Sequence, residues 1–286
     1  MKRIILSLAM IASTLAFAET TTTTAPGSAA TSTVDSSSIL EKLKASPFSL
    51  NLYTDNYTNT EKRNGFTSEN YVNVKYKIDK YHSIKVSPII VIDNTPQYKD
   101  GNGAKTTYLQ TDVNLYRSQI LTEEKNGVAL SAGLYNSIYK NTNYFENSGG
   151  KASRHGLNGT FSKTFGKNSF SLGQSIYVYN RNSGQDNISQ SYFSTSFAYS
   201  YSFNDYVSAG VYNLWYSYDA ATKYSSGYST SESFRTIPSV YFSYGDLAAS
   251  LYLDATPLRS HDGLTGTAAN WLKKSYLGVT VSYNVF

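Results

Sequence analysis

The sequence contains no cysteine, only 6 prolines and 2 methionines, and few charged residues, which make up 16% of its 286 positions. A chain without cysteine has no disulfide, no cysteine-ligated zinc and no thiol nucleophile. It also lacks a run of 18 consecutive apolar residues after residue 18, so no transmembrane helix is expected there. The formal net charge of +5 includes Lys2 and Arg3, and the mild excess that remains does not argue for nucleic-acid binding.

Aromatic residues are abundant where these other classes are scarce. The chain has 27 tyrosines and 13 phenylalanines, set among many serines, threonines and asparagines. Such a mixture favours strands over helices. The length suffices for one large domain or two small ones.

The first 18 residues have the pattern of a cleaved export signal. Residues 1–3 are positively charged, residues 4–15 are mostly apolar, and residues 16–18 provide the small side chains that a signal peptidase recognises. The alternative, a membrane anchor, needs about 20 apolar residues, and this run is shorter. We therefore predict export, with a signal peptide over residues 1–18 and Glu19 as the mature N-terminus.

Residues 19–46 are predicted to form a disordered, low-complexity periplasmic segment. Its first part is a polar tract of Thr, Ser and Ala without core-forming residues, which cannot offset the entropy cost of ordering. Ser38 and Glu41 have the spacing of a capping box, so a helix of two turns at most could end before Pro47. A frayed linker is the alternative.

From residue 47 to the end, apolar and polar residues alternate with period two, which is the pattern of strands with one apolar face. The last segment shows it most clearly, because Leu277, Val279, Val281, Tyr283 and Val285 alternate with Gly278, Thr280, Ser282 and Asn284. Its length, about ten residues, suits a tilted strand that crosses a bilayer.

This last segment, which ends on Phe286, resembles the C-terminal signature of Gram-negative outer-membrane β-barrels, which the barrel-assembly machinery reads. The resemblance implies that Tyr283 and Phe286 belong to an assembly signal. Phe286 is out of phase with the apolar face of its own strand. Either it turns outward at the rim, or a bulge shifts the register.

Twelve alternating segments can be counted, an even number, as single-chain bacterial barrels require. Short connections alternate with long polar ones, apart from a middling link near 118–127, and this matches short periplasmic turns and long outer loops. The short ones are 79–82, 166–168, 204–206 and 245–246, and the long ones are 55–68, 94–106, 140–153, 180–190, 219–232 and 256–272. We predict an all-β fold, a transmembrane antiparallel up-and-down barrel of about 12 strands over residues 47–286 in the bacterial outer membrane. Its first strand, 48–53, should pair with the last, and a secreted sandwich or propeller is the alternative.

The polar faces of these segments should line a lumen. Twelve strands give a backbone radius of about 12 Å, so small inward side chains would leave a pore for small hydrophilic solutes. The candidate pore-lining residues are Lys75, Lys77, Lys85, Asp112, Arg154, Arg235, Asp254, Tyr108, Tyr116, Tyr177, Tyr212, Tyr241 and Tyr252. This charge set leans positive, which together with tyrosine faces suits anionic or sugar-like solutes. Alternatively, the charges only hydrate the lumen.

Two other functions remain open. Outer-membrane phospholipase A is also twelve-stranded and uses a lipid-facing Ser–His–Asn set, but here Ser260-His261-Asp262 are adjacent in sequence, and adjacency alone does not make a triad. His155 lies near the outer rim and His82 in a short turn. We predict no catalytic residue, metal or cofactor, and name as partners outer-membrane lipid, lipopolysaccharide and the assembly machinery. A surface adhesion barrel that acts through its long loops is the third class.

Overall fold

The computed structural model describes residues 41, 45–60, 65–93, 105–139, 151–181, 189–221, 228–259, 263–264 and 275–286. The chain divides into two compact units, and all of these residues lie in the second, Leu40–Phe286. The predicted signal peptide and most of the predicted N-terminal segment fall outside them. Of the predicted short helix only one bond is described, from Ala45 N to Glu41 O at 3.0 Å.

Long strands account for most of the described residues. They are β1 (Phe48–Asn59), β2 (Thr67–Lys77), β3 (His82–Asp93), β4 (Lys105–Leu121), β5 (Ala129–Tyr139), β6 (Lys151–Phe165), β7 (Asn168–Arg181), β8 (Ser189–Ser202), β9 (Val207–Ala221), β10 (Tyr228–Tyr244), β11 (Leu247–Arg259) and β13 (Tyr276–Asn284). The two-residue β12 (Gly263–Leu264) pairs only with the end of β11.

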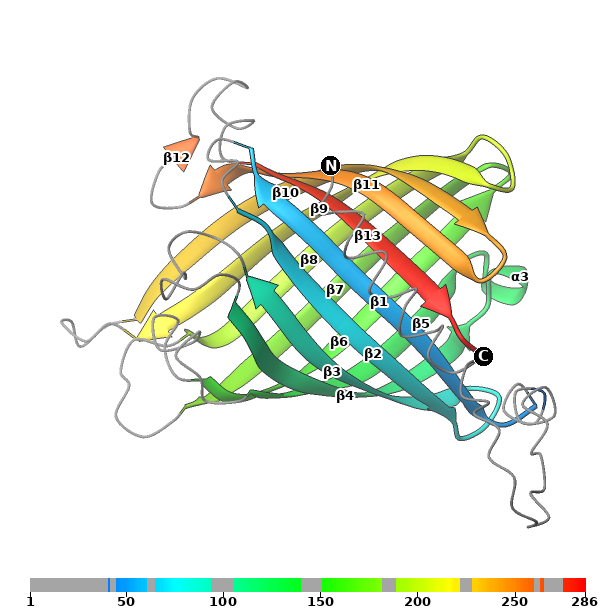
Figure 1. Cartoon of the computed structure of the whole chain (residues 1–286), viewed down its shortest axis with the longest axis horizontal. Coiled ribbons are helices and arrows are strands. Elements are labelled where there is room, and N and C mark those ends of the chain that lie inside the picture. Colours follow the sequence, from blue (N-terminus) through cyan, green and yellow to red (C-terminus); the bar gives the residue numbers. More distant parts are fainter. Residues whose placement is uncertain are drawn as a thin grey trace, which may run out of the picture. The chain divides into compact units, whose positions relative to one another are not determined.

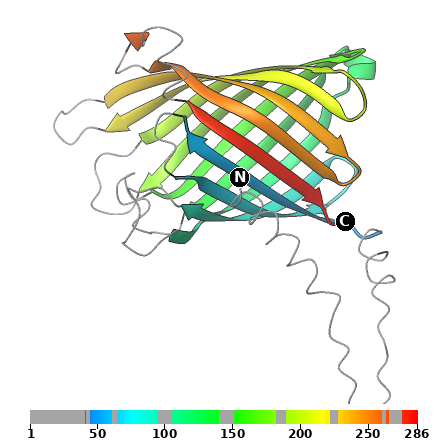
Figure 2. The ribbon, with the colours of Figure 1, turned by 45° about the horizontal axis from the view of Figure 1, so that its top comes forward.

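These strands form one closed sheet. Each of β1 to β10 pairs with the next in sequence, β11 pairs with β13, and β13 pairs with β1, so none of the twelve long strands has a free edge (Figures 1 and 2). All pairings are antiparallel. The predicted barrel of twelve strands is confirmed, as is the predicted pairing of the first strand with the last. Closure matters because an unpaired edge in lipid would leave backbone N–H and C=O groups unsatisfied.

Short and long connections alternate around the sheet. The short ones, 78–81, 122–128, 166–167, 203–206 and 245–246, gather with the C-terminus at one end (Figure 1). We call this the short-turn end, and the other the long-loop end. The middling link contains the single-turn α3 (Glu123–Asn126), which ends at Gly127 with φ 71°. No helix among the described residues is long and apolar enough to span a membrane.

Several strands continue further toward the long-loop end than the sequence predicts. β1 runs to Asn59 rather than to residue 53, and β9 and β10 extend into the stretch 219–232 that was expected to be a loop. In these extensions neither face is consistently apolar, so the period-two signal disappears although the hydrogen-bonded ladder continues. Asp55, predicted to lie in a loop, is therefore inside the barrel wall.

The distribution of exposed residues is the reverse of that in a soluble protein. Aliphatic and aromatic side chains on alternate strand positions are exposed, for example Leu157 at 55% and Ile138 at 59%. Polar side chains on the other positions are buried, for example Ser137 at 0% and Asn114 at 2%. An apolar outer face around a polar interior is what a bilayer requires of a barrel. It excludes a sandwich, which would bury its apolar face.

Two bulges change the phase that the sequence suggests. In β4, Ile89 pairs with Gln110 and Ile90 with Tyr108, so Leu109 is an extra residue. Tyr108 then shares the exposed outer face with Ile90, and its predicted place in the lumen is wrong. At the C-terminus, Val285 N donates to Leu50 O while Leu50 N donates to Phe286 O. Val285 and Phe286 thus both lie opposite Leu50, which is a bulge. Of the two alternatives for the phase of Phe286, the structure supports the shift of register.

Side chains reinforce the seam between the first and last strands. Asn51 Nδ2 donates to Ser282 Oγ at 2.7 Å and to Asn284 Oδ1 at 2.9 Å. Its Oδ1 accepts from Asn73 Nδ2 at 3.0 Å, and Asn73 Oδ1 accepts from Ser87 Oγ at 2.7 Å. One polar chain therefore crosses four strands where the barrel closes.

Candidate functional site: the charged lumen

Cationic and anionic side chains both occur among the inward residues whose surroundings the structure describes. The cations are Lys75, Lys77, Lys85, Arg154 and Arg235, and the anions are Asp55, Glu69, Asp93, Asp112 and Asp254. The carboxylates Asp55, Glu69 and Asp93 thus join the predicted Asp112 and Asp254, while the predicted lean toward positive charge stays a prediction. Asp55, Glu69 and Asp93 were missed because they lie near the long-loop ends of their strands, where the apolar alternation had faded.

Two directly paired sets of like charges lie at different heights along the barrel. Lys75 and Lys85 are directly paired on β2 and β3, toward the short-turn end. Asp55 and Glu69 are directly paired on β1 and β2, toward the long-loop end. Directly opposed like charges destabilise a sheet, so stability does not explain either pair. The lumen therefore has a lysine pair toward the short-turn end and a carboxylate pair toward the long-loop end, where Arg154 and Arg235 also lie.

Tyrosine hydroxyls hold the anionic pair. Tyr252 donates to Asp55 Oδ1 at 2.7 Å, while Tyr57 and Tyr71 donate to the two oxygens of Glu69 at 3.1 and 2.6 Å. These charge-assisted bonds fix the carboxylates against the wall. The Asp55–Glu69 pair is thus held in place by three tyrosines.

Arg235 and Asp254 form an ion pair beside these carboxylates, on β10 and β11. Arg235 Nε donates to Asp254 Oδ1 at 3.0 Å, and an Nη of Arg235 bonds the other oxygen. The pair lines a cavity of about 510 Å³ that is open to solvent. The other lining residues are Asp55, Tyr57, Glu69, Tyr216, Tyr252, Thr256 and Tyr276. Three carboxylates, one guanidinium and four tyrosines face this space.

A second cluster forms on β4, β5 and β6. Asp112 accepts from Gln110 Nε2 and from Ser137 Oγ, both at 2.7 Å, and from the Tyr135 hydroxyl. Ser137 Oγ also accepts from an Nη of Arg154 at 3.2 Å. Asp112 and Arg154, both predicted lumen residues, are therefore joined through Ser137.

A belt of tyrosines connects the two clusters along the wall. Tyr135 and Tyr177 lie 5.5 Å apart between ring centroids, Tyr177 and Tyr192 5.6 Å, and Tyr192 and Tyr216 5.5 Å. The Arg154 guanidinium lies 4.6 Å from the Tyr135 centroid and 4.8 Å from that of Tyr177. Gly156 lies opposite both Tyr135 and Tyr177, and a Cβ there would overlap the Tyr177 ring. The glycine therefore leaves room for the Tyr177 ring against the wall.

The remaining predicted lumen residues are more dispersed. Lys85 Nζ lies 5.8 Å from the Tyr116 ring centroid, and Lys77 is exposed at the short-turn end of β2. Tyr212 and Tyr241 occupy inward positions on β9 and β10, across from Ala198 and Ser250. Of the predicted set, only Tyr108 lies on the outer face.

One part of the interior is apolar. Ile89, Val91 and Leu109 are 2%, 1% and 9% exposed, and Tyr71 packs against them. The cluster lies on β3 and β4, next to the anionic pair. The sequence pattern places Ile90 and Ile92 on the apolar outer face of β3. It therefore predicts mainly small polar side chains toward the lumen.

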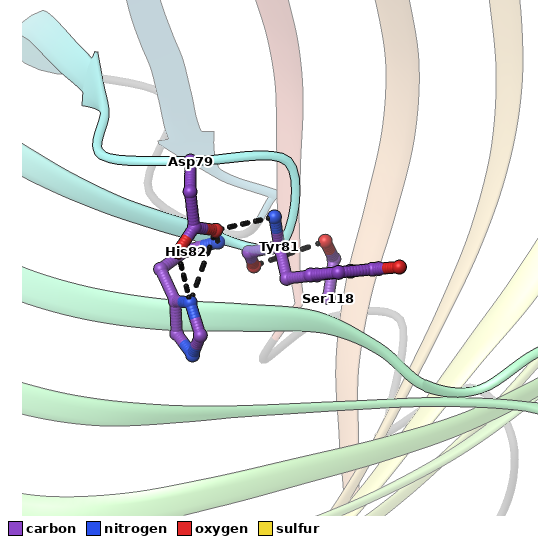
Figure 3. Close-up of polar contacts among 4 residues, drawn as sticks. All are labelled: Asp79, Tyr81, His82 and Ser118. Carbon is purple, nitrogen blue, oxygen red and sulfur yellow. Dashed lines mark hydrogen bonds and ion pairs between the residues drawn. The ribbon is translucent and has the colours of Figure 1, made fainter.

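Of the three histidines, two are described, and both have close partners. His82 Nδ1 lies 2.8 Å from Asp79 Oδ2 in the turn between β2 and β3, and the N–H groups of Tyr81 and His82 donate to Asp79 Oδ1 (Figure 3). The His82 ring and these N–H groups lower the pKa of Asp79 to about 2. Ser118 N donates to Tyr81 O at 2.9 Å, tying the turn to β4. His261 and its neighbours lie outside the described residues.

No protein-family model matches the chain, and no curated protein matches its sequence. Among solved structures it is similar to an outer-membrane channel from Pseudomonas putida F1, with 9% identity and a TM-score of 0.58 over 84% of this chain and 96% of that one. It is also similar to OmpT, an outer membrane protein of Vibrio cholerae (10% identity, TM-score 0.42, 83% and 96% covered), and to opdK from Pseudomonas aeruginosa (12%, 0.40, 83% and 98%). The chain has the fold of a Gram-negative outer-membrane β-barrel protein.

Proposed function

We propose that this protein is an outer-membrane channel for the passive diffusion of small hydrophilic solutes. The observation that carries the proposal is the polar, charged interior of a closed barrel, with a solvent-open cavity of about 510 Å³ beside the Arg235–Asp254 pair. A barrel with only a structural role has no need for opposed like charges inside, since these lower its stability. The Pseudomonas putida barrel of the same fold is itself a channel.

The lining favours sugar-like solutes over simple anions. Tyrosine faces stack against apolar sugar faces, and carboxylates and guanidinium groups bond hydroxyls without requiring a solute charge. The tyrosine belt, from Tyr135 to Tyr216, supplies the first kind of contact, and the cavity residues Asp55, Glu69 and Arg235 supply the second. A purely anionic solute would meet three carboxylates in that cavity.

Liposome swelling tests this preference. Purified protein is reconstituted into vesicles, which are diluted into isosmotic neutral disaccharide or isosmotic sugar acid of similar size. We expect faster swelling with the neutral sugar, and slower sugar entry for Tyr216→Ala, because one stacking face of the cavity is lost. Equal rates for both solutes and both proteins would contradict the sugar preference but leave passive diffusion in place.

Location and assembly form part of the same proposal. The exposed apolar outer face fits contact with outer-membrane lipid and lipopolysaccharide, and the final strand with Tyr283 and Phe286 fits recognition by the assembly machinery. Deleting Phe286 should lower the amount of folded barrel in outer-membrane fractions. Cleavage of a signal peptide after residue 18 stays a prediction, to be checked by N-terminal sequencing of the mature protein.

A further inference from the structure

A hydrogen-bonded serine, histidine and asparagine lie together on the outer face of the barrel, away from the lumen. Ser153 Oγ lies 3.1 Å from His155 Nε2, and His155 Nδ1 lies 2.8 Å from Asn136 Oδ1. Ser153 and His155 are two residues apart on β6 and so share a face. Asn136 is the direct partner of His155 on β5.

The contacts define how protons are arranged in this cluster. Asn136 Oδ1 can only accept, so His155 Nδ1 must carry a hydrogen and donate it. In the neutral ring Nε2 is then the acceptor, and it faces the Ser153 hydroxyl. A nucleophile that donates to a base, which is itself oriented by a third group, is the arrangement of Ser–His–Asp and Cys–His–Asn enzymes.

A fourth residue completes the cluster. Asn180, the partner of Ser153 on β7, brings its Nδ2 to 3.0 Å from Ser153 Oγ and 3.1 Å from His155 Nε2. An amide N–H beside the nucleophile is where a donor to a developing oxyanion belongs. Three adjacent strands therefore contribute a nucleophile, a base, an orienting group and a donor.

The surroundings indicate the substrate class. The neighbouring outward side chains are aliphatic and exposed, with Ile138 at 59%, Leu157 at 55% and Val178 at 53%. Ile138 pairs directly with Ser153, and Val178 with His155. The cluster lies near the start of β6 and the end of β7, so it borders the apolar band at the long-loop end. Carboxylic ester groups of membrane lipids lie at such a boundary between hydrocarbon and headgroups.

We propose that Ser153, His155 and Asn136 form a lipid-facing acyl-ester hydrolase site. Ser153 Oγ attacks the ester carbonyl carbon while its proton passes to His155 Nε2, and Asn180 Nδ2 donates to the oxyanion. Collapse breaks the bond to the alcohol oxygen, which takes the proton from His155 and leaves the acyl group on Ser153. Water, deprotonated by His155, then releases the fatty acid and restores the serine. This site is independent of the lumen and of the proposed channel.

The test uses the full-length protein, folded in detergent and mixed with phosphatidylethanolamine in micelles, with fatty-acid release as the readout. We expect release by the native protein and a loss of about 100-fold or more in Ser153→Ala and His155→Ala. Ser217→Ala is the matched control, because Ser217 also lies on the outer face, paired with the exposed Phe193 on β8. Equal release by native protein and Ser153→Ala would overturn the proposal.

A covalent probe tests the native protein itself. A fluorophosphonate should label the native barrel on the peptide that contains Ser153, and labelling should be lost in His155→Ala. Absence of label, or label on another serine, would contradict the assignment. Asn136 is a positioning residue, so Asn136→Ala should lower kcat with KM unchanged, and Asn136→Asp should restore it. Bilayer conductance of Ser153→Ala should stay native, which separates this test from that of the channel.

Discussion

The hydroxyl of Tyr252 on β11 reaches Asp55 on β1 at 2.7 Å, although β13 lies between the two strands. It does so by passing over Gly278, the residue of β13 that pairs with Tyr252. A Cβ at residue 278 would overlap the Tyr252 ring. The contact between Tyr252 and Asp55 therefore depends on a glycine in the closing strand.

Replacing Gly278 by alanine should displace Tyr252 and release Asp55. We expect a loss of about 1–3 kcal/mol in the free energy of unfolding, the usual cost of overpacking, together with a changed single-channel conductance. Urea unfolding in detergent measures the first effect. Gly159→Ala is the control, because its Cβ would meet only Ser131 O, at 3.9 Å. Identical behaviour of the two variants would show that Tyr252 does not rely on Gly278.

The two like-charged pairs should act on ion selectivity in opposite directions. Neutralising Lys75 and Lys85 as glutamines should move the reversal potential in a KCl gradient toward cation preference. Neutralising Asp55 and Glu69 as Asn and Gln should move it toward anion preference. Each permeability ratio should change by roughly a few-fold, because local potentials of several kT raise ion concentration. Shifts of the same sign, or none, would mean that ions bypass these side chains.

Asn51 should be important for closing the barrel. Its side chain bonds both Ser282 and Asn284 of β13 and accepts from Asn73 of β2. Asn51→Ala should lower the free energy of unfolding by about 1–3 kcal/mol, since part-buried partners lose their bonds. Heat-modifiable gel mobility and urea unfolding report the change. Asn158→Ala, an inward asparagine on β6 away from the seam, should cost less, and a larger cost there would contradict this role.

The stability of the turn that contains Asp79 should depend on pH. The pKa of Asp79 is lowered to about 2, first by the His82 ring and then by two backbone N–H groups. A lowered carboxyl pKa means that this stabilisation is present above the ordinary value of 3.8 and is lost as pH falls through about 2. An NMR titration of the Asp79 carboxyl in detergent should find that midpoint. His82→Ala should raise it, though not fully to 3.8, because the backbone bonds remain. An unchanged midpoint would exclude the ring as its main cause.

Much of the fold could be predicted because the bilayer imposes a simple pattern. Leu277, Val279 and Val281 alternate with small polar residues because one face meets lipid, and the same requirement acts on every strand. The alternation of apolar and polar residues no longer predicts the structure where a strand has no apolar face or where a bulge shifts its register. Asp55 lies in an extension without an apolar face, and Tyr108 changes sides at a bulge that no local residue announces.

The outer-face cluster was missed for a different reason. Ser260, His261 and Asp262 are neighbours in the sequence, whereas Ser153, His155 and Asn136 meet only because β5 and β6 pair in one register. The serine and histidine two positions apart on a strand were the available signal, since they must share a face. The asparagine could not have been found without the pairing.

If the lumen is a pore, the inserted barrel conducts ions. Planar-bilayer recording of the purified protein, first in symmetric 1 M KCl and then in a KCl gradient, measures this conduction, with Asp55→Asn/Glu69→Gln and Lys75→Gln/Lys85→Gln recorded beside the native chain. We expect discrete, ohmic current steps from the native protein. The ion selectivity should shift in opposite directions in the two variants. A folded, inserted barrel that gives no steps would contradict the channel.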